Sequence, residues 1–104
     1  MKPDIIEKSW GHEKIIDNNP EYCGKLLVFR AGGSTSMHYH AKKLETMYLQ
    51  SGKMLIRMED ETIPLEVGDK IQIQRFQLHQ IIAIEDSELF ECSTTDAPED
   101  SIRL

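Results

Sequence analysis

Short β-rich runs, each closed by a turn signal, are the feature of this chain that most constrains its fold. From about residue 22 onward, runs rich in Val, Ile, Leu, Tyr and Phe recur at the roughly 8–12-residue spacing of antiparallel β proteins. Turn-forming pairs separate these runs at Gly32-Gly33, Ser51-Gly52 and Gly68-Asp69. No stretch keeps the 3.6-residue apolar period of an amphipathic helix over three turns. The pattern predicts an all-β sandwich or barrel.

Seven or eight strands are expected, at residues 22–30, 36–40, 46–50, 53–58, 63–67, 70–74, 79–84 and 89–93. Residues 70–74 alternate strictly, with Ile71 and Ile73 on one face and polar side chains on the other. Pro64 predicts an edge strand, because proline cannot donate a hydrogen bond to a central ladder. The best helical candidate is the short segment 3–8.

The length of the chain limits its architecture. A chain of 104 residues forms one domain and is too short for a (β/α)₈ barrel, which needs roughly 250 residues. A small jelly roll suits this length, because the inner faces of its two sheets share one interior. We expect an N-terminal arm at residues 1–20, a barrel at 21–95 and a C-terminal tail at 96–104. Met54, Ile56 and Met58 share one face of their strand and are expected in the core.

The net charge and the N-terminal sequence limit the partners and the location that we expect for this protein. The chain carries 12 Lys and Arg against 18 Asp and Glu, a net charge of −6, which argues against a nucleic-acid partner. No run reaches the ~18 apolar residues of a membrane span. The N-terminus lacks the apolar core of a secretory signal, which predicts a cytoplasmic protein. In that reducing compartment, Cys23 and Cys92 are expected as free thiols.

Three histidines and a glutamate have the spacing of metal ligands. His38 and His40 leave the same face of a predicted strand, with Cα atoms ~6.5 Å apart. Glu45 starts the next strand, and His79 lies on a later strand within reach of the same cavity. Imidazole nitrogens with one carboxylate suit one ion of Zn, Mn, Fe, Ni or Co better than Mg or Ca. Taken singly, each histidine could instead be hydrogen-bonded in the core, and Glu45 could be a solvated strand end.

The joint spacing resembles the motifs of the cupin family. The segment GGSTSMHYHAKKLETMYLQSG matches the first cupin motif, G-x5-H-x-H-x4-E-x6-G, in register at Gly32, His38, His40, Glu45 and Gly52. The resemblance implies an all-β, single-domain cupin jelly-roll barrel that binds one metal ion through these two histidines and this glutamate. It covers nearly the whole chain, from Lys8 to Arg103.

The second cupin motif, G-x5-P-x-G-x2-H-x3-N, is matched at Gly68 and at His79, the fourth implied ligand. The sequence departs from this motif where Gln74 replaces Pro, Phe76 replaces Gly and Ala83 replaces Asn. Proline and glycine there would fix a sharp bend. The turn before His79 must therefore form differently, and Phe76 is a candidate wall of the cavity.

Further segments resemble the C-terminal domain of type II mannose-6-phosphate isomerases. Lys8-Ser9-Trp10-Gly11 is similar to that group's K-P-W-G, and residues 24–32 to its V-K-R-I-x-V-x-P-G, which places Lys25 on the group's lysine. Lys43 falls where the group usually has Arg, and residues 99–103 are similar to its acidic, arginine-bearing end. His38 stands where these isomerases commonly have Gln, which favours a generic metal site over the specific substrate.

The resemblance implies a metal-dependent isomerase or epimerase that interconverts aldose and ketose forms of a phosphorylated sugar. Lys25 and Arg103 are the candidate catalytic residues, as binders of phosphate or of the developing negative charge. Lys25 shares strand parity with Leu27 and Phe29, so it points inward if they do, and it then needs a carboxylate or an anionic substrate as partner. The alternatives are a strand-end lysine with its ammonium in water, and an Arg103 in a frayed terminus.

Two other functions remain open at this point. The same ligands suit an Fe(II)-dependent cupin dioxygenase, and a cupin can also bind or sense a small ligand without catalysis. Tyr39 and Tyr48 point away from the ligands. Because small cupins usually pair through their sheets, we expect a homodimer with these tyrosines in its interface.

Overall fold

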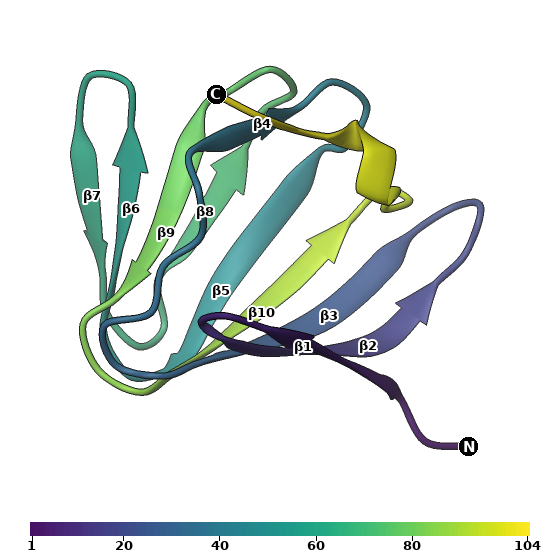
Figure 1. The fold of residues 1–104 in the computed structure, drawn as a ribbon, viewed down its shortest axis with the longest axis horizontal. Helices are drawn as coiled ribbons and strands as arrows, with labels where there is room; N and C mark the ends of the chain where they lie inside the picture. Colours follow the sequence, from purple (N-terminus) through teal and green to yellow (C-terminus); the bar gives the residue numbers. More distant parts are fainter.

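Two antiparallel sheets face each other in the computed structural model, which describes residues 1–104 (Figure 1). The first sheet has six strands in the spatial order β1 (Asp4–Lys8), β2 (Gly11–Asn18), β3 (Cys23–Phe29), β10 (Ser87–Ser93), β5 (Glu45–Ser51) and β8 (Lys70–Ile73). The second has five, in the order β11 (Ser101–Arg103), β4 (His38–His40), β9 (His79–Ala83), β6 (Met54–Met58) and β7 (Thr62–Leu65). The predicted all-β jelly-roll class is confirmed.

The strands predicted between residues 22 and 93 are all present, with ends that differ by one or two residues. They were visible in the sequence because each buries alternate side chains, as in the strictly alternating burial of β3 and β9. The strand that contains Pro64, β7, lies at the edge of the second sheet as predicted.

The helical candidate at residues 3–8 is not a helix, because residues 4–8 form β1, which pairs along its whole length with β2. All five residues of β1 are exposed, so the segment buries no apolar stripe that would stabilise a helix this short. Gly11 begins β2 with a φ of 152°, and a Cβ there would overlap the carbonyl of Val28 on β3. This close approach lets the β1–β2 hairpin join the sheet.

Both ends of the chain are hydrogen-bonded into the sheets. Residues 1–20 contain β1 and β2, and residues 96–104 contain the short 3₁₀ helix η1 (Pro98–Asp100) and β11. In Figure 1 the C-terminal segment passes beside β4, and β11 pairs with that strand. The sequence analysis predicted neither β2 nor β11, because both lack a clean alternation of buried and exposed side chains.

The interior between the sheets is apolar in one part and charged in another. The apolar core consists of Trp10, Leu27, Phe29, Met47, Leu49, Met54, Ile56, Met58, Leu65, Ile73, Ile81, Ala83 and Leu89. It includes the methionines and the isoleucine predicted for β6. The buried charged and imidazole groups gather where β3, β5 and β9 begin and β10 ends, together with η1; they are Lys25, His40, Lys43, Glu45, His79, Glu91 and Asp100. The candidate functional site lies in this second part.

Both cysteines are free, as predicted: Cys23 is buried and Cys92 is exposed. No helix in the structure is long and apolar enough to cross a membrane.

Candidate metal centre

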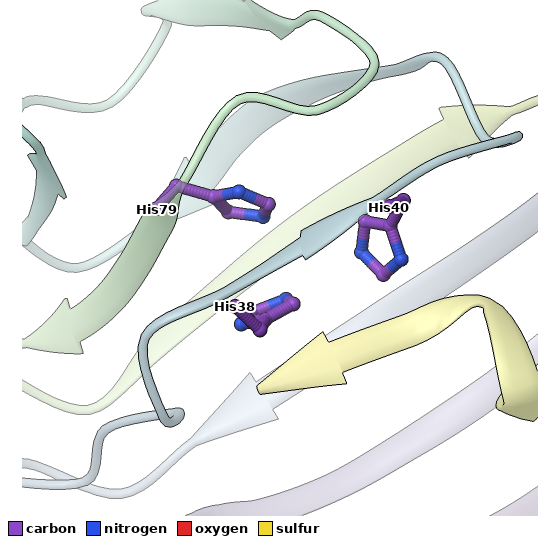
Figure 2. A group of neighbouring side chains, drawn as sticks. All are labelled: His38, His40 and His79. Atoms are coloured by element: carbon purple, nitrogen blue, oxygen red, sulfur yellow. The ribbon is translucent and has the colours of Figure 1, made fainter. Parts of the chain in front are cut away.

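Three imidazoles meet at the junction of β4 and β9. His38 and His40 leave the same face of β4, and His79 begins β9 directly opposite His38. Their ligand nitrogens lie within 4.8 Å of one another, and Figure 2 shows the three rings around a common space. The two-residue spacing on one strand and the pairing of two neighbouring strands bring the histidines together.

Backbone carbonyls fix the tautomer of each imidazole. The Nδ1 atoms lie 2.8 Å from Ser36 O for His38, 3.2 Å from Asp100 O for His40 and 2.8 Å from Gln77 O for His79. A carbonyl only accepts hydrogen bonds, so each neutral ring carries its proton on Nδ1 and donates it outward. Each Nε2 then keeps a free lone pair, which is the arrangement that metal-binding histidines use.

The contact between His79 and Glu45 indicates that a cation belongs in this space. Nε2 of His79 is fully buried without a hydrogen-bond partner, and it lies 3.4 Å from Oε1 of Glu45. Glu45 Oε2 lies 3.7 Å from Nε2 of His40. A lone pair and a carboxylate that face each other in the interior destabilise the fold unless a positive charge stands between them. The residues therefore fit a divalent transition ion.

Burial and neighbouring charges also favour the protonation states that bind a metal ion. It lowers the pKa of His38 to about 4 and also lowers the pKa of His40, so both rings are neutral near pH 7. Burial alone would raise the pKa of Glu45, but its contacts with His79 and the Lys43 ammonium lower it to about 2. Neutral imidazoles and an ionised carboxylate are the forms that bind metal.

A network of buried and half-buried charges adjoins the histidines. Lys43 Nζ lies 2.9 Å from Glu45 Oε2, 3.1 Å from Glu91 Oε2 and 3.0 Å from Asp96 Oδ1. Lys25 Nζ lies 2.6 Å from Asp96 Oδ2 and 3.3 Å from Glu13 Oε1. We call these six residues the charge network. The sequence analysis missed Glu13, Glu91 and Asp96; the inward parity that Glu91 shares with Leu89 on β10 was the available signal.

Lys25 points inward together with Leu27 and Phe29, as its strand parity predicted. Its expected partner exists within the chain, in the carboxylates of Asp96 and Glu13. Burial alone would lower the pKa of Lys25, but Glu91 and these two partners raise it. The ammonium is thus charged and already paired on the wall of the cavity.

Arg103 lies in β11, where it pairs with His38 of β4 in the strand register. The terminus therefore forms a strand at this position. Arg103 is exposed, makes no ion pair and is one of the residues that line a cavity of about 1530 Å³. The same cavity is lined by His38, His40 and Glu45. The structure thus places a cation and three of the four candidate ligands around one cavity.

The expectation that Phe76 walls this cavity is wrong. Its side chain is 67% exposed and lies 6.0 Å from the ring of Tyr39, measured between centroids. Its φ is 66°, the left-handed conformation that glycine takes at the corresponding place of the cupin motif. The Phe76 amide donates to the His40 carbonyl at 2.7 Å, which closes the turn and directs the ring outward.

Asp100 is a site residue that the sequence analysis did not single out. Its buried carboxylate accepts hydrogen bonds from the amides of Ala41, Lys42 and Lys43 at 3.0–3.1 Å. Its carbonyl is the group that holds Nδ1 of His40. The similarity of residues 99–103 to the acidic end of the isomerase group was the only sequence feature that pointed to Asp100. It did not predict the contacts of Asp100 with His40 and residues 41–43.

Comparisons with known proteins agree with the two-sheet fold. The profile of the Cupin domain family matches residues 25–91. KdgF from Halomonas sp. is similar in structure with a TM-score of 0.83 at 20% identity, over 92% of this chain and 91% of that chain. An RmlC-like cupin from Shewanella frigidimarina gives a TM-score of 0.84 at 15% identity, over 93% and 87%. A variant of Bacillus subtilis oxalate decarboxylase gives 0.83 at 16%, over 98% of this chain and 30% of that chain.

A comparison with curated protein sequences finds no match. The structural similarities lie below 25% identity and therefore concern the fold alone. The family profile, by contrast, spans more than half of the chain and includes all four predicted ligands. With its two facing sheets and its motif histidines in contact, this chain belongs to the cupin domain family.

Proposed function

We propose that this cupin binds one divalent transition ion and isomerises or epimerises a small hydroxylated substrate, of the sugar-phosphate kind implied by its resemblance to type II mannose-6-phosphate isomerases. The observation that carries the proposal is the convergence of three Nε2 lone pairs whose tautomers are fixed by backbone carbonyls. An ion held by His38, His40 and His79, with Glu45 beside them, would polarise a substrate carbonyl and its neighbouring hydroxyl.

In this proposal, other residues around the cavity bind the phosphate and carry the transferred proton. Arg103 anchors the phosphate, because its guanidinium is unpaired and lines the cavity. Lys25 is the weaker anchor, since a substrate phosphate would compete with Asp96 and Glu13. Glu91 holds the transferred proton, because burial and the neighbouring charge of Glu45 raise its pKa. Its Oε1 accepts no hydrogen bond, so it is available to a substrate.

The metal site is tested by elemental analysis of the purified protein and its variants. We expect about one transition ion per chain in the wild type and little in His38→Ala, because removing one of three nitrogen ligands weakens binding. His12→Ala is the matched control, since His12 lies on β2 outside the imidazole cluster. Full retention of metal by His38→Ala would contradict the site.

Turnover is tested with metal-loaded protein on a panel of aldose and ketose phosphates. Arg103→Ala is expected to raise KM about tenfold or more for phosphorylated substrates, whereas Arg57→Ala, an exposed arginine outside the cavity, is expected to leave it unchanged. No interconversion of any substrate would count against an isomerase. Thermal stabilisation by a sugar phosphate without turnover would indicate a binding protein instead.

One observation favours an Fe(II) dioxygenase as the second candidate. Lys43 shares Glu45 with the imidazoles, so the strongest donors are three neutral nitrogens, a set that suits ferrous iron and leaves room for oxygen and substrate. Oxygen consumption by iron-loaded protein, absent in zinc-loaded protein, would support this function.

A further inference from the structure

The buried ammonium of Lys43 has an unusual set of neighbours. Its side chain is 4% exposed, and Nζ lies within 3.1 Å of three carboxylates, those of Glu45, Glu91 and Asp96. It donates a hydrogen bond to Glu91 Oε2 and forms ion pairs with the other two carboxylates, so its charge is neutralised within the chain. A lysine this deeply buried must therefore act on the site through the carboxylates that it holds.

The two oxygens of Glu45 have different surroundings. Oε2 lies 2.9 Å from the Lys43 ammonium and 3.7 Å from Nε2 of His40, whereas Oε1 faces Nε2 of His79 at 3.4 Å and makes no ion pair with a lysine. We propose that Lys43 is a positioning residue of the metal centre, which withholds one oxygen of Glu45 from the metal and leaves only Oε1 to bind it. This inference rests on the proposed metal site.

Lys43 is itself held in place by other residues. The Lys43 amide donates to Asp100 Oδ2 at 3.0 Å, and the ammonium is tied on its far side to Glu91 and Asp96. Glu45 thus cannot bring Oε2 closer to the imidazoles than its present 3.7 Å from Nε2 of His40 without weakening an ion pair in the interior. Since the ammonium and the metal attract the same carboxylate, Lys43 also weakens Glu45 as a metal ligand.

Titration with Co(II) tests this role, because its visible absorption reports the ligands of the ion independently of activity. In Lys43→Met we expect the Co(II) spectrum to change and Kd to fall by about tenfold, since both oxygens of Glu45 become available. Lys43→Arg, which keeps the charge, should restore the wild-type spectrum. Lys25→Met is the matched control for loss of a buried lysine, because Lys25 also contacts Asp96 but does not contact Glu45. Its spectrum should match the wild type, whatever its turnover.

A second pair of variants identifies Glu45 as the intermediary. In a Glu45→Ala background, Lys43→Met should leave the Co(II) spectrum unchanged and alter Kd by less than about threefold, because the coupled partner is gone. A spectral change of the same size with and without Glu45 would overturn the proposal. So would a Kd in Lys43→Met that rises or stays equal to the wild-type value.

Lys43→Met leaves buried carboxylates without a partner and could prevent folding, so the double variant Lys43→Met/Glu91→Gln, which removes one positive and one negative charge, repeats the test. A wild-type spectrum and Kd in this variant would overturn the role of Lys43 while leaving the metal site intact. Failure of the wild-type protein to bind Co(II) would overturn both the proposed function and this inference.

Discussion

The histidines illustrate how single residues of this site depend on main-chain atoms. Each imidazole presents Nε2 inward because a carbonyl two residues away, or that of Asp100, accepts the proton of Nδ1. The motif spacing predicted which histidines meet. It could not predict their tautomers, because these follow from where three carbonyl groups point in the folded chain.

Asp96 provides a pH-dependent test of the charge network at the scale of one residue. Burial alone would raise its pKa, but Lys43 and Lys25 lower it from 3.8 to about 2. A carboxyl with a lowered pKa stabilises the fold above its ordinary pKa, and this contribution is lost as the pH falls toward 2. Asp96→Asn should therefore lower the free energy of unfolding at pH 7 by about 1–3 kcal/mol. The difference from wild type should shrink between pH 4 and pH 2.

Urea unfolding of both proteins at several pH values measures this difference. Asp17→Asn is a suitable control, because Asp17 is exposed and contacts neither lysine. A gap between wild type and Asp96→Asn that stays constant from pH 7 to pH 2 would show that the ion pairs do not stabilise the fold.

At the scale of secondary structure, the C-terminal segment contacts both the imidazole cluster and the loop that carries Lys43. Asp100 supplies its carboxylate to the loop at residues 41–43 and its carbonyl to His40. Asp100→Ala should lower the free energy of unfolding by about 2–4 kcal/mol, because three backbone amides lose a charged acceptor. Asp100→Asn, which keeps one acceptor oxygen, should lose less. Urea unfolding measures both, with Glu99→Ala as the exposed neighbour for control.

Strand β11 of this segment and strand β1 could not be predicted from the sequence. Strands β3, β5, β6 and β9 were predicted because one face of each is buried, which leaves an alternation in the residues. In β1 and β11 every residue is exposed, so the sequence carries no such pattern. These strands form through backbone pairing with β2 and β4, and that pairing depends on tertiary contacts.

The whole molecule should be stabilised by the metal that its site is expected to bind. The unpaired Nε2 of His79 and the facing carboxylate of Glu45 exist only in the folded chain, so metal binding shifts the folding equilibrium toward it. At a free metal concentration of 100 Kd, the gain is about 2.7 kcal/mol. Differential scanning calorimetry should show a higher Tm with Zn than with chelator, and no such shift for His38→Ala. Equal shifts in both proteins would place the metal elsewhere.

The quaternary structure remains a prediction. Tyr48 is exposed on β5, as its parity opposite to Glu45 required, and a homodimer through the outer face of this sheet is expected. Light scattering of wild type and Tyr48→Glu tests it: the buried charge should convert a dimer to a monomer.

The link from Asp100 to residues 40–43 has a consequence for how the protein is made. A ribosome releases the histidines of β4 well before it adds Asp100, about sixty residues later in the chain. Until then His40 lacks the carbonyl that sets its tautomer, and the loop that carries Lys43 lacks its acceptor. We therefore expect the candidate centre to take its final form only after residue 100 has been synthesised.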